Sequence, residues 1–152
     1  LSPIIDVATL TGACVVALGT VCSGGFTNNQ ATLDRVIEAG RAAGEKIWQL
    51  PLFEEYHDQI KGDWGDIKNT GGREAGAITA AAFLANFVGN TPWVHLDIAG
   101  TARVRNQKGW VVKGHTGVPV RTLVNFVLRE AGVEAAAAGA EPEVPASPSG
   151  VL

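Results

Sequence analysis

The stretch IIDVATLTGA, residues 4–13, combines an apolar run, a single aspartate and a series of small residues. Its apolar and β-branched residues from Ile4 to Ala8 predict a short, buried β-strand. The TLTG segment that follows, residues 9–12, offers main-chain groups with little bulk around them. WVHLDIAG, residues 93–100, repeats this order of a strand followed by small residues. The sequence therefore predicts two strand ends at which the backbone is accessible.

Helical patterns separate and follow these strands, which is typical of an α/β domain. We expect helices at residues 32–43, shortly after Pro51, at 77–88 and from Val120 to near Gly132. Thr32 or Asn29 could cap the first of them, and Gly44 is placed to end it. The segment AITAAAFLANFV, residues 77–88, is apolar on nearly every side, so we expect this helix to be buried.

The chain has 152 residues, the length of one domain, and its composition, 46% hydrophobic and 18% charged, indicates a well-buried chain or one with buried interfaces. Its net charge of −3 gives no support to a nucleic-acid or anionic membrane partner. No apolar run approaches the ~20 residues of a transmembrane helix, and no signal peptide is recognisable. Cys14 and Cys22 are too few for a disulfide framework, which favours a reducing, cytoplasmic setting. The absence of methionine, together with the abrupt opening strand, suggests a piece of a longer polypeptide.

The three histidines indicate no catalytic or metal site. His57, His95 and His115 lie far apart in the sequence and match neither HxxxH nor HExxH spacing. We expect His57 on a surface helix and His95 on a half-buried strand.

The acidic residues and the glycines assign no chemistry either. Asp6, Asp66 and Asp97 stand alone in the sequence, and a metal site would require several converging ligands. The chain has no Gly-x-Ser-x-Gly elbow and no Walker loop, and TGACVVALG lacks the GxGxxG spacing of a dinucleotide site. The residues alone thus predict an α/β domain without an assigned catalytic residue or metal ligand.

Four blocks of sequence, taken together, carry a family resemblance. DVATLTGACVVALG, AGAITAAAFLANFV, HLDIAGTA and GHTGVPVRTLVNFVL occur in this order. They resemble the C-terminal part of the catalytic domain of the leucine aminopeptidase family, the M17 or cytosol aminopeptidases. The resemblance covers about residues 1–132 and implies an α/β fold with a mixed central sheet flanked by helices. The Ala/Pro/Glu-rich remainder, residues 133–152, is expected to be a disordered tail.

The resemblance implies a peptidase function for the intact protein. Members of the family are cytoplasmic homohexamers that use two divalent metal ions, zinc or manganese, to release N-terminal residues such as leucine from peptides. Their Asn-Thr-Asp-Ala-Glu-Gly-Arg signature, the other metal ligands and the catalytic lysine precede the block that matches residues 4–13. The resemblance therefore assigns no catalytic residue and no metal ligand to this chain, which should be inactive by itself. A non-catalytic binding or assembly subunit of the same fold is the alternative.

What the resemblance assigns to this chain is the wall of the substrate cleft. Leu10 and Gly12 match positions whose main-chain groups bind the peptide. The pocket for the N-terminal side chain is matched by four positions: Thr9, Gly12, Ala99 and Ala102. Without the resemblance, the same small residues would be interpreted as close packing between strand and helix.

Three further positions differ from their counterparts in relatives or lie in a loop of different length. Thr70 falls near the wall for the second residue of the peptide, in a loop that looks one residue shorter than in some relatives. His115 stands where many relatives have a small residue, and Arg103 where an aromatic is common. Neither of these two matches a ligand position, so we interpret both as surface variation.

Overall fold

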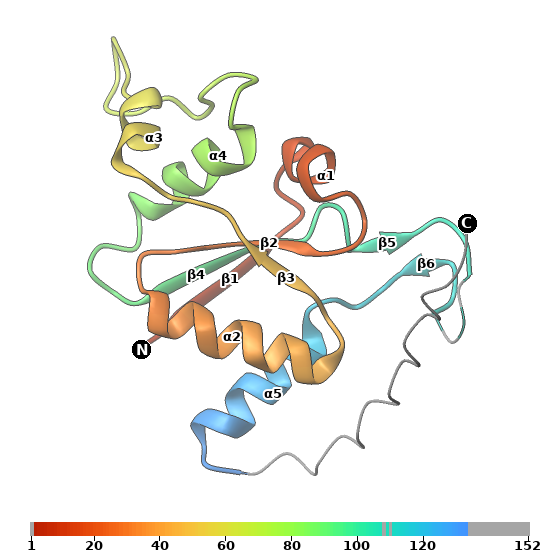
Figure 1. Ribbon diagram of the computed structural model, residues 1–152. Helices are drawn as coiled ribbons and strands as arrows, with labels where there is room; N and C mark the ends of the chain where they lie inside the picture. Colours follow the sequence, from red (N-terminus) through yellow and green to blue (C-terminus); the bar gives the residue numbers. More distant parts are fainter. Residues whose placement is uncertain (1, 108, 110, 134–152) are drawn as a thin grey trace, which may run out of the picture.

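The computed structural model describes residues 2–107, 109 and 111–133. Within them, a mixed four-stranded sheet lies between two layers of helices, which confirms the expected α/β class (Figure 1). Of the tail expected at residues 133–152, only Val133 is described, so that expectation falls outside the described residues.

The sheet is mixed because its strands run in both directions. Its order is β1 (Ile4–Ala8), β4 (Trp93–Asp97), β2 (Ser23–Thr27) and β3 (Ile47–Gln49). β1 runs parallel to β4 and β2 runs parallel to β3, whereas β2 and β4 are antiparallel. The two strands predicted from the sequence, β1 and β4, are confirmed and are direct neighbours, with Ala8 paired to Asp97.

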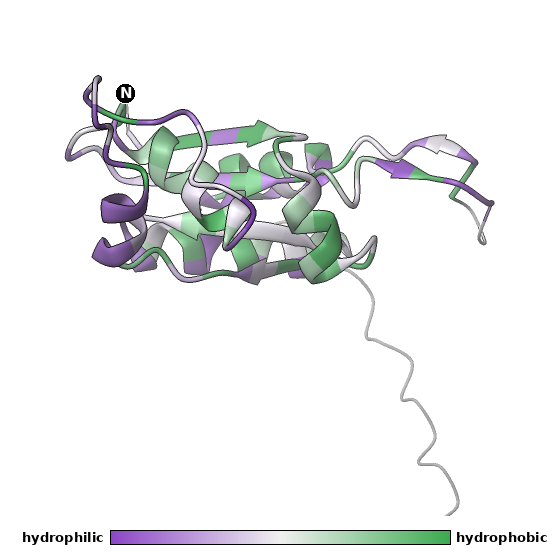
Figure 2. Ribbon diagram, turned by 90° about the horizontal axis from the view of Figure 1, so that it is seen from above, coloured by the Kyte–Doolittle hydropathy of each residue, from purple (hydrophilic) through white to green (hydrophobic). Residues whose placement is uncertain are grey.

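Helices cover both faces of the sheet (Figure 1). One face carries α1 (Gly12–Leu18), α3 (Glu54–Gln59) and α4 (Gly76–Ala85), and the other carries α2 (Gln30–Ala43) and α5 (Val120–Glu130). The helices predicted from periodicity are confirmed as α2, α3, α4 and α5, whereas α1 is not evident in the sequence pattern. A two-stranded hairpin, β5 (Arg103–Val104) with β6 (Gly114–His115), projects from the body of the domain (Figure 2).

The core between the sheet and the α2–α5 layer is apolar. Six buried residues form it: Leu33, Val36, Ala39, Val94, Leu96 and Phe126. Fully burying a Leu, Val or Phe side chain contributes about 1.5–3 kcal/mol relative to exposure, so this packing holds α2 and α5 on the sheet. Asn29, one of the two predicted caps, begins α2 by accepting a hydrogen bond of 3.0 Å from the Thr32 N–H. Gly44 ends the helix with a φ of 69°, as its position predicts.

The core on the opposite face relies on smaller side chains. Its buried members are Cys14, Phe26, Ala77, Ala81 and Trp93. Alanines allow α4 to pack closely against its neighbours, and the predicted burial of this helix is confirmed. The helix ends at Ala85, so the last residues of the AITAAAFLANFV segment form a turn.

β1 does not have the environment that its sequence predicts. It lies at an edge of the four-stranded sheet, and Ile4 is 36% exposed. A strand with one neighbour leaves a row of main-chain groups unpaired on its outer side. In the described part of the chain, β1 is therefore an edge strand that is less buried than its apolar run predicts.

Two glycines make β2 difficult to predict from the sequence. Gly24 and Gly25 lie within β2, although glycine is normally depleted in strands. A Cβ atom at Gly24 would lie 3.0 Å from the Sγ of Cys14, and one at Gly25 would lie 3.0 Å from the Cγ2 of Ile47. Close packing on both faces of the strand therefore favours glycine at both positions.

Candidate functional site

The carboxyl ends of β1 and β4 meet at one edge of the sheet. The two strands are parallel, and beyond the Ala8–Asp97 pair the Ile98 N–H donates to the Ala8 carbonyl at 2.9 Å. The segments that follow the strands, residues 9–12 and 98–102, therefore lie side by side. Five of the six predicted substrate-binding residues are in these segments, and we call them the strand-end wall: Thr9, Leu10, Gly12, Ala99 and Ala102.

A single carboxylate joins the two segments of this wall. Asp97 is completely buried, and its Oδ1 accepts hydrogen bonds from the Leu10 N–H at 3.2 Å and the Ala99 N–H at 3.1 Å. Its Oδ2 accepts a hydrogen bond of 2.7 Å from the Thr11 hydroxyl. The parallel pairing of β1 and β4 brings Asp97, which stands alone in the sequence, to hydrogen-bond donors 86 and 87 positions away.

Thr11 and Gly12 begin α1 at the wall. The Thr11 Oγ1 accepts a hydrogen bond of 3.0 Å from the Cys14 N–H, which makes Thr11 the N-cap and Gly12 the first helical residue. The first N–H groups of a helix have no partner within the helix, and the Gly12 N–H has none elsewhere among the described residues. A Cβ atom added at Gly12 would meet no atom within 4 Å, so this position borders open space.

Leu10 has one of its two main-chain groups engaged and the other without a partner in the described part of the chain. Its N–H is engaged by Asp97, whereas its carbonyl oxygen accepts no hydrogen bond within the described part of the chain. A free acceptor at Leu10 and a free donor at Gly12 therefore stand two residues apart on one exposed segment. This is the donor and acceptor pattern that an extended peptide backbone can pair with.

Close backbone packing fixes the second segment of the wall. Gly100 is buried, and a Cβ atom there would lie 2.0 Å from the Gly19 carbonyl oxygen, so no larger residue fits. The Ala102 N–H donates to the Ile98 carbonyl at 2.8 Å. The Thr101 and Ser23 hydroxyls are hydrogen-bonded to each other at 2.7 Å, which ties this segment to β2.

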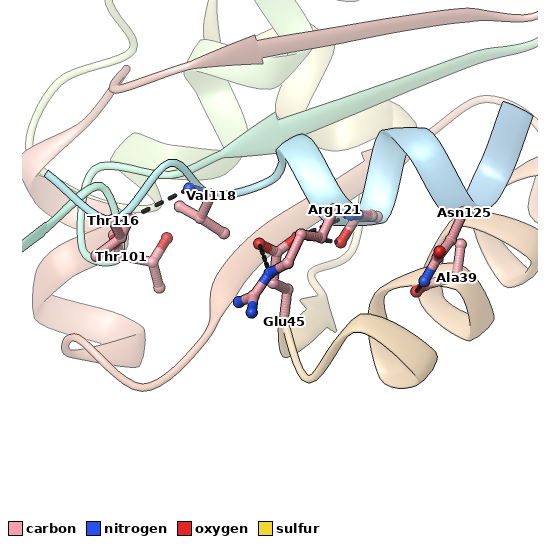
Figure 3. Close-up of polar contacts among 8 residues, drawn as sticks. Ala39, Glu45, Thr101, Thr116, Val118, Arg121 and Asn125 are labelled. Atoms are coloured by element: carbon pink, nitrogen blue, oxygen red, sulfur yellow. Dashed lines mark hydrogen bonds and ion pairs between the residues drawn. The ribbon is translucent and has the colours of Figure 1, made fainter. Parts of the chain in front are cut away.

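Thr116 connects the wall to the start of α5. Its hydroxyl donates to the Thr101 carbonyl at 2.7 Å and accepts from the Val118 N–H at 3.3 Å (Figure 3). The hairpin begins and ends at this junction, with Arg103 paired to His115. Both of these side chains are exposed, as expected for surface positions, and their difference from relatives stays a prediction.

A second buried carboxylate, Glu45, binds the first turn of α5. Glu45 is 6% exposed, and its Oε2 accepts from the Thr122 N–H at 2.9 Å and the Thr122 hydroxyl at 2.6 Å. Its Oε1 accepts from the Arg121 Nε at 3.2 Å (Figure 3). None of these partners belongs to the strand-end wall.

Thr70, the sixth predicted site residue, is not brought to the wall. It is exposed on the loop before α4, where its Oγ1 accepts a hydrogen bond of 3.3 Å from the Gly72 N–H. A hollow of about 580 Å³ lies between this loop and α1, and its lining includes Thr11, Val16, Gly72 and Arg73. Thr70 is therefore close to the hollow in sequence but makes no hydrogen bond to the other five residues.

His95 and Asp6 form a buried polar pair away from the wall. His95 is completely buried, with its Nδ1 2.6 Å from the Asp6 Oδ1, and the Trp93 Nε1 donates to the Asp6 Oδ2 at 2.5 Å. The His95 Nε2 has no partner in the described residues. The expectations of a half-buried histidine and an isolated Asp6 are both wrong, because the strand register places Asp6 directly beside His95.

Cys14 is a buried cysteine that lies against Asp97. Its Sγ is 3.7 Å from the Asp97 main-chain oxygen. Burial, with a contribution from the negative charge of Asp97, raises the pKa of the Cys14 thiol to about 11. The thiol is therefore protonated at neutral pH, and the thiolate is the reactive form of cysteine.

The carboxylates of the described chain do not fit a metal site. Among residues 2–107, 109 and 111–133, no three His, Cys, Asp or Glu side chains are grouped so that they could hold a metal ion. The buried carboxylates are already engaged, Asp97 with three donors and Asp6 with His95 and Trp93.

None of the described helices is long and apolar enough to cross a membrane.

Comparison with known proteins identifies the family. The model of the cytosol aminopeptidase family, catalytic domain, matches residues 2–124. A probable cytosol aminopeptidase of Clostridium tetani is 59% identical over 120 residues, which are 79% of this chain and 25% of the relative. A probable cytosol aminopeptidase of Gloeobacter violaceus is 54% identical over 84% of this chain and 25% of its own length.

Solved structures agree with this assignment. A tomato leucine aminopeptidase mutant superposes with a TM-score of 0.77 at 46% identity, over 83% of this chain and 24% of the plant chain. A bottromycin maturation enzyme, BotP, superposes with a TM-score of 0.81 at 37% identity, over 84% of this chain and 29% of its own. The chain spans about a quarter of the length of the curated relatives. It belongs to the cytosol aminopeptidase family, with residues 2–124 in the catalytic domain.

Proposed function

We propose that the polypeptide containing this chain is a metal-dependent aminopeptidase that releases N-terminal residues, leucine and similar ones, from peptides. In this proposal residues 1–132 form the C-terminal part of the catalytic domain, and residues 133–152 form a tail without a role in catalysis. The names of the relatives, cytosol aminopeptidase and leucine aminopeptidase, support the activity and a cytoplasmic location. A homohexameric assembly follows from the family resemblance.

The strand-end wall is the observation that carries this proposal. An exposed segment presents the free Leu10 carbonyl and the free Gly12 N–H beside a second segment of small residues. A peptide in the cleft would donate a main-chain N–H to the Leu10 oxygen and accept from the Gly12 N–H. The side chains of Thr9, Ala99 and Ala102 would then border the pocket for the N-terminal residue. Hydrogen bonds to the backbone would position any peptide, whereas the size of the pocket would select its first side chain.

In this proposal the chain has a binding role and not a chemical one. Two divalent ions, zinc or manganese, are proposed for the intact enzyme, and their ligands belong to parts of the polypeptide outside this chain. Thr70 is proposed to border the site for the second residue of the peptide, across the hollow that lies next to α1. The chain by itself should therefore bind peptides weakly and hydrolyse none.

Expression of the full-length polypeptide and of residues 1–152 tests this division of roles. Each is assayed with leucine 4-nitroanilide after addition of zinc or manganese. We expect turnover by the full-length protein and none by the isolated chain. Turnover by a soluble isolated chain would contradict the proposal. A full-length protein that assembles and binds peptide but never turns over would instead select the alternative, a non-catalytic binding or assembly subunit.

A further inference from the structure

The two segments of the strand-end wall come from strands that are far apart in the sequence. Beyond the last strand pair, one main-chain hydrogen bond links them directly, from the Ile98 N–H to the Ala8 carbonyl. In the described part of the chain, the other hydrogen bonds that connect the segment after β1 with the segment after β4 are made by the side chain of Asp97. Asp97 is therefore the side chain that links the two segments beyond the end of the strand pair.

We propose that Asp97 is a positioning residue that sets the width of the pocket for the N-terminal side chain, an inference that rests on the proposed function. Asp97 does not touch the peptide itself, because it is completely buried. It acts through Leu10 and Ala99, whose N–H groups share its Oδ1, and through Thr11, whose hydroxyl donates to its Oδ2. Leu10 and Ala99, on the two sides of the pocket, are thus joined to the same carboxylate oxygen.

A carboxylate suits this position better than any other side chain. An ionised carboxylate only accepts, and its two oxygens have room for the three donors that converge here. Hydrogen bonds to an ionised acceptor are shorter and stronger than neutral ones, so they hold the segments at a defined distance. Asparagine has nearly the same shape, but its amide nitrogen would face the Thr11 hydroxyl as a donor and could not accept its proton.

Loss of the Asp97 carboxylate should change the selectivity between leucine and alanine substrates more than it changes folding. If the segments separate, the pocket becomes wider, and a leucine side chain loses contacts that an alanine side chain never makes. Misfits of about one methylene change discrimination by roughly 10–200-fold. The ratio of kcat/KM for leucine 4-nitroanilide to that for alanine 4-nitroanilide reports this directly. Because the amount of folded enzyme cancels in the ratio, a purely structural role would leave it unchanged.

The test uses the full-length, metal-loaded protein with Asp97→Asn, Thr11→Val and Thr11→Ser. We expect the leucine-to-alanine ratio to fall at least about threefold in Asp97→Asn and in Thr11→Val. Thr11→Ser keeps the hydroxyl and should restore the wild-type ratio. Glu45→Gln is the matched control, because it neutralises a buried carboxylate that also binds a threonine hydroxyl and a main-chain N–H but touches no wall residue. Its ratio should stay within about twofold of wild type.

The outcomes separate this inference from the proposed function. A wild-type protein that hydrolyses neither anilide overturns the proposed function and this inference with it. An active wild type whose ratio is unchanged in both Asp97→Asn and Thr11→Val overturns the inference alone. An equal fall in the ratio for Glu45→Gln also overturns it, because the effect would then follow from neutralising any buried carboxylate.

Discussion

Asp97 and Glu45 are two buried carboxylates with nearly the same kinds of partner, and they hold very different parts of the molecule. Each accepts a hydrogen bond from a threonine hydroxyl, 2.7 Å at Thr11 for Asp97 and 2.6 Å at Thr122 for Glu45. Asp97 also accepts hydrogen bonds from two main-chain N–H groups, and Glu45 accepts one from the Thr122 N–H. Asp97 joins two segments, the first of which borders open space at Gly12, whereas Glu45 holds the start of a helix that packs on the core.

The two carboxylate sites differ in the other contacts that support the segments they bind. α5 is held by Phe126 in the core and by a hydrogen bond of 3.3 Å from the Asn125 side chain to the Ala39 carbonyl (Figure 3). The segment with Leu10 and Gly12 is exposed and has no comparable apolar contact in the described chain. Similar hydrogen bonds can therefore serve stability at one site and the shape of a binding surface at the other.

The largest expected effect is on the wall side, from Ala99→Phe in the full-length protein. The added ring should fill the proposed pocket, so kcat/KM for leucine substrates should fall about 10–200-fold more than for alanine substrates. Steady-state kinetics with the two anilides measures this. Val124→Phe is the control on the Glu45 side, since Val124 is 52% exposed on α5 and should tolerate the ring. Equal losses on both substrates would show that Ala99 serves packing and not the pocket.

Replacing each carboxylate by alanine should lower the thermal stability of the protein by a different amount at the two sites. Asp97→Ala removes the partner of two main-chain N–H groups and one hydroxyl. Glu45→Ala removes the partner of one main-chain N–H, one hydroxyl and the Nε of Arg121, whose side chain is half-exposed and can be solvated by water instead. An unsatisfied buried donor costs about 1–3 kcal/mol. We expect both variants to lower the thermal midpoint of the full-length protein by several degrees, and Asp97→Ala to lower it more. A larger fall for Glu45→Ala would reverse the comparison.

The smallest effect concerns Cys14, which lies against Asp97. Because its pKa is raised to about 11 from 9.0, the folded protein retains a proton that the unfolded chain releases between pH 9 and 11. Stability should therefore fall as the pH rises through this window, by at most about 1 kcal/mol per pH unit from this group. Thermal midpoints at pH 8 and pH 10.5 measure the fall, which should be shallower in Cys14→Ala. Identical pH dependence in the two proteins would show that Cys14 does not contribute.

Patterns in the sequence predict the elements with a helical period or a continuous apolar run. α2 and α5 follow from helical spacing, β1 and β4 from short apolar runs and α4 from a longer apolar, alanine-rich run, and Gly44 marks the end of α2. β2 and α1 do not follow from such patterns, because their glycines and small residues are set by contacts with other elements. Gly24 and Gly25 are explained by Cys14 and Ile47, which only the folded chain brings near.

The candidate site divides in the same way. The resemblance supplies the five residues of the wall, and the structure places them together at one edge of the sheet. Asp97 and Thr11 have no such signal, since an aspartate at the end of a strand has no meaning until its partners 86 and 87 residues away are known. Only the parallel register of β1 and β4 turns Asp97 into the link between the two segments.

The central claim, that the strand-end wall binds peptide through its backbone, is tested most directly at Gly12. Thr11 has an extended backbone, which is compatible with a following proline, and Gly12 is the first helical residue, where proline is well tolerated. Gly12→Pro therefore removes the N–H without breaking α1, while Gly12→Ala adds a methyl group that meets no atom of the chain.

Kinetics of both variants in the full-length assembled protein gives the answer. A lost hydrogen bond in a desolvated site costs about 1–3 kcal/mol, so kcat/KM for leucine 4-nitroanilide should fall roughly 5–150-fold further in Gly12→Pro than in Gly12→Ala. Sizing and thermal midpoints should be unchanged in both. If both variants assemble normally and keep the wild-type kcat/KM, the Gly12 N–H does not bind the peptide and the wall is only a turn.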